Sequence, residues 1–254
     1  MEVAIVIPSR YASKRLPGKA LLRQTGKYLV EHVYERACRA KLSRQVIVAT
    51  DDPRIVAAVE SFGGRVVLTR RDHPSGSDRV AEVARQLDCD VVINLQGDEP
   101  LVDPQSLDAL AQILLRDPNA EMATLAVPMD TVEQWQDPNC VKVVCDSRGR
   151  ALYFSRAAIP YVRDGRPNLS LEPSHFLQHL GIYAYRREFL LQLTSLPPHP
   201  LEQLEKLEQL RVLAQGYPIS VGVVHHTAIG VDTYEDYQRF VETYQRHGQP
   251  RRAA

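Results

Sequence analysis

Short apolar runs alternate with amphipathic stretches through the first half of the chain. The runs Val3–Ile7, Val46–Thr50 and Val66–Leu68 predict buried strands. A helix is predicted from Pro53 toward Phe62, because an Asp near the cap and a Pro at an early position favour a helix start. Strands separated by helices in this way are typical of βα units.

The same alternation continues to the middle of the chain. Asp78–Leu87 predicts a helix, since its apolar residues recur on one helical face, and Asp90–Leu95 predicts a fourth strand. A polar turn, Gln96–Pro100, and a helix over Pro104–Leu115 follow. These elements predict a parallel, doubly wound α/β arrangement.

The order of predicted elements changes in the second half of the chain. Val141–Cys145 and Ala151–Ser155 flank Asp146–Gly149, which predicts antiparallel strands joined by a glycine turn. The stretch Pro160–Pro173 predicts a long exposed loop. The remaining predicted elements are a strand over Leu180–Tyr185, one helix over Leu201–Gln215, a strand over Ile219–Val224, a helix over Tyr234–His247 and a polar, disordered tail over 248–254.

Length and composition narrow the class of protein. The chain has 254 residues with no internal repeat, which predicts a single α/β domain over 1–247 with a β-rich insertion at roughly 128–186. Lys plus Arg and Asp plus Glu both number 31, and this balance argues against nucleic-acid or stable membrane partners. The chain begins with a strand and has no apolar stretch long enough to cross a bilayer, which predicts a cytoplasmic protein.

The cysteines and histidines do not form a recognisable metal pattern. Without close CxxC pairing, the cysteines are expected to be reduced and mostly buried; they are Cys38, Cys89, Cys140 and Cys145. His175 and His179 would share a face if they lay on a helix, but the strand predicted directly after them argues against a zinc pair. His225-His226 is expected in a loop or at a strand end.

A basic loop follows the first predicted strand. It carries Arg10, Lys14, Arg15 and Lys19, with Pro17-Gly18 forming a turn before the last lysine. Open α/β sheets bind ligands at the carboxyl ends of their strands. Because this loop is cationic, a polyphosphate is the expected ligand. A solvated basic loop is the alternative on charge alone.

Two aspartates could serve a metal. Asp98 follows a buried strand, so its carboxylate is expected at the edge of the sheet. Carboxylate oxygens there suit a Mg²⁺ ion that also binds phosphate groups. A surface turn with a capping Asp is the alternative. For Asp232 taken alone, the sequence favours the N-cap of the last helix, because Asp followed three residues later by Glu235 resembles a capping box. It becomes a second metal ligand only if both segments converge in space.

The remaining polar motif is Ser75–Arg79, which is either a helix N-terminus offering amide donors to a ligand or a plain capped helix start. Neither GxGxxG, GxxxxGK[ST] nor GxSxG occurs. A cationic loop with carboxylates and no evident nucleophile suits metal-assisted nucleotidyl transfer.

Taken in order along about 225 residues, nine segments resemble the 3-deoxy-manno-octulosonate cytidylyltransferases, also called CMP-Kdo synthetases. The segments are Arg10–Lys19, Val48–Asp51, Ser75–Arg79, Asn94–Pro100, Met122–Pro128, Ala151–Arg156, His179–Tyr183, Leu207–Arg211 and Gly230–Thr233. The resemblance implies a nucleotide-diphospho-sugar transferase-like, Rossmann-like fold, with a mixed sheet flanked by helices and a small β-rich dimerisation insertion. It also implies a cytoplasmic homodimer that uses Mg²⁺ and couples CTP to the sugar acid Kdo, releasing pyrophosphate.

The resemblance also assigns site residues. The triphosphate would be held by Arg10, Ser13, Arg15 and Lys19, and the cytosine nucleotide would lie near Ser75, Gly76, Ser77 and Arg79. Mg²⁺ would be bound by Asp98 and Asp232, which with Arg15 and Lys19 form the implied catalytic set. The sugar-acid pocket would be lined by Gln96, Arg156, His179, Tyr183, Glu208 and Gln209.

Two alternatives stay open. One is a cytidylyltransferase for a related sugar acid, such as 8-amino-Kdo or a sialic acid; Glu99 favours Kdo itself, because amino-sugar relatives can carry Gln there. The other is a non-catalytic nucleotide sensor, against which the presence of both Asp98 and Asp232 argues. Ser9 and Tyr234 depart from residues common in the family, and neither change removes a predicted ligand.

Overall fold

The computed structural model describes residues 1–13, 15–171, 173–225 and 230–248. The chain divides into two compact units, each built from separate segments. The β1 unit consists of Glu2–Asp88, Asn94–Gln105 and Ala228–Ala254, and the β5 unit of Met1, Cys89–Ile93 and Ser106–Thr227. Predicted features at Lys14, His226 and 249–254 lie outside the described residues.

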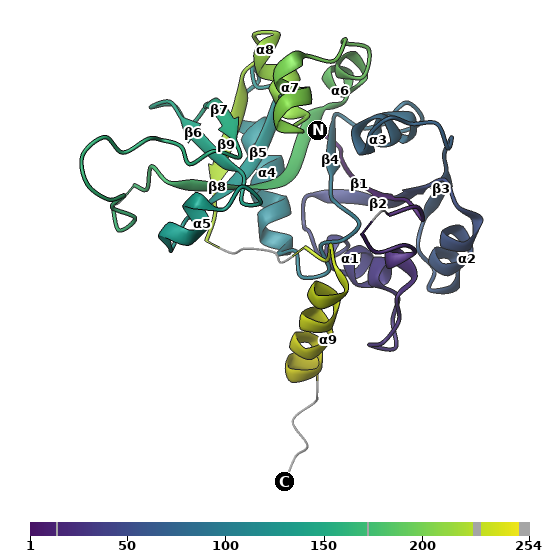
Figure 1. Cartoon of the computed structure of the whole chain (residues 1–254). Helices are drawn as coiled ribbons and strands as arrows, with labels where there is room; N and C mark the ends of the chain where they lie inside the picture. Colours follow the sequence, from purple (N-terminus) through teal and green to yellow (C-terminus); the bar gives the residue numbers. More distant parts are fainter. Residues whose placement is uncertain (14, 172, 226–229, 249–254) are drawn as a thin grey trace. The chain divides into compact units, whose positions relative to one another are not determined.

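The β1 unit is built on parallel strands (Figure 1). Strand β2 pairs with β1 on one side and with β3 on the other. The last residue of β1, Ser9, lies opposite Thr50 of β2. The strands are β1 (Val3–Ser9), β2 (Ser43–Thr50) and β3 (Val66–Leu68). The helices that pack on them are α1 (Leu29–Ala37), α2 (Pro53–Ser61) and α3 (Gly76–Ala84). The three predicted strands and the helices predicted from Pro53 and over Asp78–Leu87 are therefore confirmed within a few residues at each boundary, whereas α1 was not predicted.

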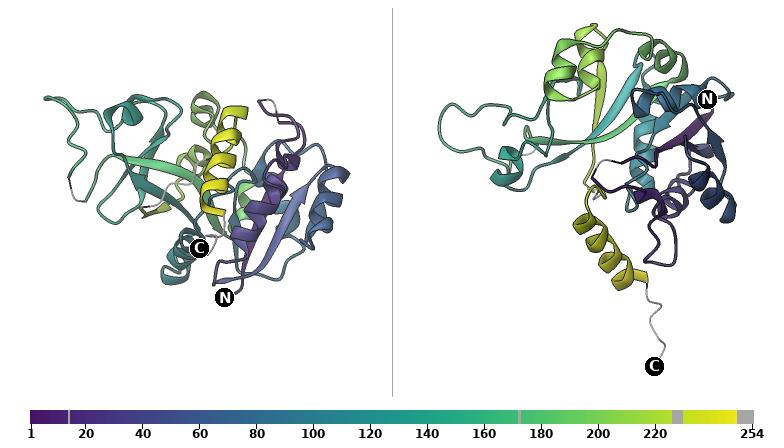
Figure 2. Two further views of the ribbon diagram at one scale, coloured as in Figure 1. Left: turned by 90° about the horizontal axis from the view of Figure 1, so that it is seen from below. Right: turned by 45° about the vertical axis from the view of Figure 1, so that its right-hand side comes forward.

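The last helix completes the core of the β1 unit. Helix α9 (Tyr234–Gly248) lies beside α1, as the yellow and purple helices of Figure 2 show. Leu29 of α1 packs in one buried cluster with Tyr237 and Phe240 of α9, and Val231 of the preceding segment belongs to the same cluster. Burying these large apolar side chains is what attaches the chain's last segment to its first strands.

The β5 unit contains a mixed sheet. Its central strand, β5, runs antiparallel to β8 and parallel to β9, and β6 pairs with both β7 and β8. Its strands are β5 (Met122–Pro128), β6 (Lys142–Cys145), β7 (Ala151–Ser155), β8 (Leu177–Arg186) and β9 (Ile219–Val223). The predicted β6–β7 hairpin is confirmed, and Gly149 takes the left-handed conformation at φ 74° in its turn.

Helices flank this sheet, and strand β4 includes residues of both units. The helices are α4 (Pro104–Arg116), α5 (Val132–Gln136), α6 (Arg187–Leu193), α7 (Pro200–Glu205) and α8 (Gln209–Ala214). Strand β4 (Val91–Asn94) has its last residue in the β1 unit and the others in the β5 unit. The β5 unit is larger than the insertion predicted over 128–186, and the single domain over 1–247 stays a prediction.

The single helix predicted over Leu201–Gln215 is wrong. The helix stops after Glu205, Lys206 takes a left-handed conformation at φ 55°, and α8 begins at Gln209. The leucines recur at a strict spacing of three, and each such step falls about 60° short of a full helical turn. One straight helix could not turn them all toward one core, so Leu204 is 79% exposed whereas Leu210 is buried.

Candidate active site

The ammonium of Lys19 lies between two carboxylates in the β1 unit. Its Nζ donates to Asp98 Oδ2 in a short ion pair, and it lies 3.4 Å from Asp232 Oδ1. It also donates to the carbonyl of Val231 at 3.2 Å. Both predicted metal ligands therefore meet at the predicted triphosphate lysine, which is the convergence that the sequence could not establish.

Backbone contacts hold these segments together. The amide of Val231 donates to the carbonyl of Asp98 at 2.8 Å, which fixes Asp232 beside the turn that carries Asp98. Lys19 begins a short 3₁₀ helix after Gly18, whose φ of 68° favours glycine. A Cβ at Gly18 would also lie 3.1 Å from the ring of Tyr11. The basic loop is thus folded back on itself to present Lys19.

Asp232 does not cap the last helix, so the capping-box alternative is wrong. The cap is built by Thr233 and Asp236: Asp236 accepts from the amides of Asp232 and Thr233, and the hydroxyl of Thr233 accepts from the Asp236 amide at 3.2 Å. The carboxylate of Asp232 instead pairs with Arg15 Nη2 at 2.8 Å and with Lys19. Its charge is therefore directed at the basic loop.

The other residues of the basic loop have different positions. Arg10 is exposed and makes no ion pair with any of the described residues. Ser13 accepts from the amide of Leu16 at 3.4 Å, which shapes the loop. Arg54, which sequence reasoning did not single out, stacks on the ring of Tyr11 with its guanidinium carbon 3.4 Å from the centroid. A cation–π contact across two elements has no signal in sequence spacing.

The turn that carries Asp98 contains buried polar atoms without partners. A Cβ at Gly97 would lie 2.4 Å from Ser9 Oγ and 2.8 Å from the carbonyl of Pro8, so this position accepts only glycine without a shift. Among the described residues, no hydrogen bond reaches Ser9 Oγ, Asn94 Oδ1 or Glu99 Oε2, all of which are buried. Burial, assisted by the charge of Asp98, raises the pKa of Glu99 well above its usual range.

The Ser75–Arg79 segment is a capped helix start next to the basic loop. Ser75 is the N-cap of α3 and accepts from the amide of Asp78 at 3.1 Å. A Cβ at Gly76 would lie 3.8 Å from Pro8, which places the first turn of α3 at the end of β1. Arg79 is 5% exposed and pairs with Asp51 at 2.9 Å, so it braces this turn from within the protein.

Several predicted sugar-acid residues meet in the β5 unit. The ring of His179 lies 5.3 Å from that of Tyr183, and its Nε2 lies 2.9 Å from the hydroxyl of Thr124. Burial lowers the pKa of His179 to about 3, so its ring is neutral. Burial and the nearby charge of Glu208 raise the pKa of Tyr183 well above its usual range, so its hydroxyl keeps its proton. Gln209, which follows Glu208 in the sequence, is buried at the start of α8.

Arg156 is held by carbonyl groups rather than by an opposite charge. Its Nε donates to the carbonyl of Glu205 at 2.8 Å and its Nη1 to the carbonyl of Pro138 at 3.0 Å. Its own carbonyl accepts at 2.7 Å from Lys142, whose ammonium is buried. Within the part of the chain that the structure describes, no hydrogen bond of Arg156 Nη2 to the protein is found.

Gln96 belongs to the β1 unit, whereas the other predicted sugar-acid residues belong to the β5 unit. Its carbonyl accepts from the amide of Glu99 at 3.3 Å, and its side chain is half-buried. Sequence resemblance alone places it with the sugar-acid residues.

The residue types that commonly bind metals do not cluster in the part of the chain that the structure describes. No group of three His, Cys, Asp or Glu residues among those described could hold a metal ion. His179 lies on β8 rather than on a helix, so it cannot form the helical zinc pair with His175. The cysteines are free, but Cys38 is exposed at the end of α1 and Cys89 alone is buried among the four, so the expectation of mostly buried cysteines is wrong.

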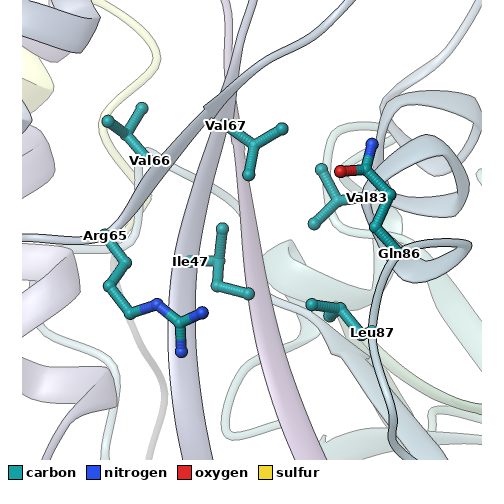
Figure 3. Close-up of a pocket in the computed structure, with 7 residues that line it drawn as sticks. All are labelled: Ile47, Arg65, Val66, Val67, Val83, Gln86 and Leu87. Carbon is teal, nitrogen blue, oxygen red and sulfur yellow. The ribbon is translucent and has the colours of Figure 1, made fainter.

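A pocket of about 180 Å³ lies elsewhere in the β1 unit (Figure 3). It is formed by β2, β3 and the end of α3, and its lining is Ile47, Arg65, Val66, Val67, Val83, Gln86 and Leu87. It contains none of the predicted site residues and no carboxylate, so we do not assign the chemistry to it.

Comparison with known proteins identifies the family. The family model for cytidylyltransferases matches residues 4–221. A 3-deoxy-manno-octulosonate cytidylyltransferase from Rhodopirellula baltica is 49% identical over 243 residues, which cover 94% of this chain and 97% of the relative. The chain belongs to the 3-deoxy-manno-octulosonate cytidylyltransferase family. A second member, from Syntrophobacter fumaroxidans, is 51% identical over 244 residues, covering 95% of this chain and 96% of that one.

A solved structure supports the fold of this family member. The structure of CMP:2-keto-3-deoxy-manno-octonic acid synthetase complexed with CTP is 44% identical, with a TM-score of 0.90, and covers 97% of this chain and 100% of that chain. The nucleotide-diphospho-sugar transferase-like α/β fold predicted from the sequence is confirmed, as is the class of enzyme, a nucleotidyltransferase. Each helix among the described residues is too short or too polar to span a bilayer.

Proposed function

We propose that the chain transfers CMP from CTP to the anomeric hydroxyl of 3-deoxy-D-manno-octulosonate (Kdo), giving CMP-Kdo and pyrophosphate for lipopolysaccharide biosynthesis. The observation that carries this proposal is the position of Lys19 between Asp98 and Asp232, in a chain that is 49% identical to a relative named for this reaction. A lysine beside two carboxylates provides both signs of charge that a nucleoside triphosphate and its metal require.

The triphosphate is assigned to Arg10, Ser13, Arg15 and Lys19. Arg10 is exposed, and the side chain of Arg15 is 65% exposed, so both cations can turn toward phosphate oxygens. The first turn of α3, over Ser75–Ser77, supplies backbone N–H donors beside the end of β1. Arg79 supports that turn through its ion pair with Asp51.

Asp98 and Asp232 are assigned to Mg²⁺. Their carboxylates already share one cation, the Lys19 ammonium, so the same oxygens suit a small divalent ion. Mg²⁺ is commonly bound by one or two carboxylates together with substrate phosphates. The carboxylates of Asp98 and Asp232 match this type of coordination. When bound, the ion would polarise phosphate oxygens and lower the pKa of the attacking hydroxyl.

The sugar acid is assigned mainly to residues of the β5 unit. Nη2 of Arg156, which has no partner among the described residues, suits a charge-assisted hydrogen bond to an oxygen of the sugar acid's carboxylate. His179 is neutral and the hydroxyl of Tyr183 keeps its proton, so both suit sugar hydroxyls. The remaining residues of this set are Gln96, Glu208 and Gln209.

In the proposed reaction, the anomeric oxygen of Kdo attacks the α-phosphorus of CTP in line with the leaving group. A phosphorus–oxygen bond forms to the sugar, the bond from the α-phosphorus to the bridging oxygen breaks and releases pyrophosphate, and the hydroxyl proton passes to solvent. Lys19 can exchange its carboxylate partners for phosphate oxygens and, with Arg15, neutralise the pyrophosphate as negative charge develops on it. Positioning and charge neutralisation are thus the main contributions of the chain.

A homodimer in the cytoplasm is part of the proposal. The β5 unit exposes large apolar side chains on neighbouring strands, Leu152 of β7 at 62% and Val223 of β9 at 51%, which a second copy could cover. Sedimentation of the purified chain tests the dimer, and fractionation of cells that express it tests the compartment. A monomer at micromolar concentration would contradict the first assignment.

Pyrophosphate release across a panel of nucleotides and sugar acids tests the reaction. We expect release with CTP and Kdo in the presence of Mg²⁺, and little with ATP, GTP or UTP. Preference for 8-amino-Kdo or a sialic acid would replace Kdo as substrate. Binding of CTP without release for any sugar acid would indicate a nucleotide sensor.

A further inference from the structure

The hydroxyl of Thr124 links a buried histidine to the backbone of the neighbouring strand. Its Oγ1 lies 2.7 Å from the carbonyl oxygen of Ile182 and 2.9 Å from His179 Nε2. All three residues are part of the β5 unit, and Thr124 and His179 are buried.

This contact results from an irregularity between β5 and β8. Thr124 is opposite Tyr183 and Ala126 is opposite His179, so Leu180–Ile182 form a bulge against the one residue, Leu125, between those pairs. Gly181 permits the bulge with a φ of 73°. The bulge brings the carbonyl of Ile182 and the ring of His179 to the same hydroxyl.

The positions of the protons follow from the distances. Two oxygens at 2.7 Å need a hydrogen between them, and a carbonyl has none, so the Thr124 hydroxyl donates to Ile182. The same hydroxyl must then accept from His179, which places a proton on Nε2. The Gly181 amide is directed at Nε2 at 3.3 Å and would donate to it if Nε2 held the lone pair. The two shorter contacts of the Thr124 hydroxyl decide between the tautomers, because both contain a hydrogen only when Nε2 is protonated.

A neutral imidazole carries one N–H, so the other ring nitrogen has a lone pair. Burial lowers the pKa of His179 to about 3, and the ring is therefore neutral at physiological pH. Among the described residues, none hydrogen-bonds to Nδ1. The ring is braced by Phe154, edge-on at 4.9 Å between centroids, and by Tyr183.

We propose that Thr124 is a positioning residue that fixes His179 as the Nε2–H tautomer, so that Nδ1 accepts a hydrogen bond from a hydroxyl of the sugar acid. This assignment rests on the proposed function, which places His179 against the sugar. A lone pair repels a carboxylate, so His179 recognises a hydroxyl and the acid group is left to Arg156. Thr124 touches no substrate and acts through the histidine alone.

The tautomer can be measured on the wild-type protein. In long-range ¹H–¹⁵N NMR spectra of the full chain labelled at histidine nitrogens, with His179→Gln used to assign the signal, we expect a protonated Nε2 and an unprotonated Nδ1. A protonated Nδ1 in wild type would overturn the proposal. This measurement requires no substrate, so it stands even if Kdo is not the sugar acid.

Kinetics test the consequence. Thr124→Val keeps the shape but removes the hydroxyl, and we expect loss of the single tautomer and a rise of about tenfold in the KM for the sugar acid, with the KM for CTP unchanged. Thr124→Ser keeps the hydroxyl and should restore both readouts. Equal rises in both KM values, or an unchanged KM for the sugar acid when the tautomer is lost, would overturn the role of Thr124. Absence of turnover in wild type with every sugar acid would count against the proposed function and not against the tautomer.

Discussion

The amide of Val231 donates to the carbonyl of Asp98 at 2.8 Å, although the two residues are far apart in the sequence. This single backbone bond joins the turn after β4 to the segment before α9. It places the carboxylates of Asp98 and Asp232 on either side of the Lys19 ammonium. The proposed metal site is therefore assembled by the fold rather than by a local motif.

Replacing Asp98 with Asn should reduce kcat at least about a hundredfold, even at high Mg²⁺, because a neutral amide oxygen is a weak ligand for a hard cation. Steady-state pyrophosphate release measures the change. Asp72→Asn is the matched control, since its carboxylate belongs to the same unit and is 74% exposed in a pair with Arg70. Retained activity in Asp98→Asn would remove this residue from the metal site.

Replacing Lys19 with Met should raise the KM for CTP about tenfold or more, since the triphosphate loses a charge-assisted partner. The comparison is with Lys27→Met, which removes a lysine paired with Glu35 elsewhere in the same unit. A variant with an unchanged nucleotide KM would show that Lys19 serves only to neutralise the carboxylates.

Replacing Lys206 with Gly should stabilise the protein by about 0.5–1 kcal/mol, because Lys206 holds a left-handed φ of 55° that glycine adopts without steric cost. Thermal unfolding should shift upward by about 1–3 °C. Lys206→Ala keeps the Cβ and should not stabilise. Equal shifts for both variants would point to the lysine charge rather than the backbone.

Lowering the pH should destabilise the protein in part through His32. This side chain is 5% exposed, packs edge-on against Phe240 and Tyr244, and has a pKa lowered to about 4 by burial. The folded pKa is below the unfolded value of about 6.5, so the unfolded state binds more protons between these values. Stability is then fully present above pH 6.5 and is lost as the pH falls toward 4.

Chemical unfolding at pH 7.5 and pH 5 measures this loss, and we expect His32 to account for on the order of 1–2 kcal/mol of it. His32→Phe keeps the packing without the titrating group, so its stability should fall less between the two pH values. An identical fall in both proteins would assign the effect to other groups.

Much of the β1 unit could be predicted because β1 and most of β2 are buried apolar runs with clear boundaries. Pro53 at the first position of α2, with Asp52 as the cap, is a start signal that needs no tertiary information. Helix α1 has a weaker signal, since its N-cap is Tyr28 rather than a usual capping residue, and only Glu31, which accepts from the Tyr28 amide at 3.1 Å, marks its start. It was missed for that reason, and its stability comes from packing against α9.

The candidate site was less accessible to sequence reasoning. Asp232 is followed by two acidic residues, Glu235 and Asp236, and spacing alone favoured a capping box with the first. The structure caps the helix with Asp236 and Thr233, because Asp232 is drawn to Lys19 and Arg15. Contacts between segments that are distant in the sequence determine which residue caps the helix, and local sequence patterns do not reveal those contacts.

The balance of charge around Lys19 has a consequence for the order in which ligands are admitted. With Asp98 and Asp232 each matched by a cation, the empty site attracts neither a lone metal ion nor a lone nucleotide strongly. A metal ion arriving alone must displace an ammonium that has nowhere to go, and a nucleotide arriving alone faces two carboxylates. On the proposed assignment, each would neutralise the group that the other releases, so the site would bind the metal ion and the nucleotide more strongly together than either one alone.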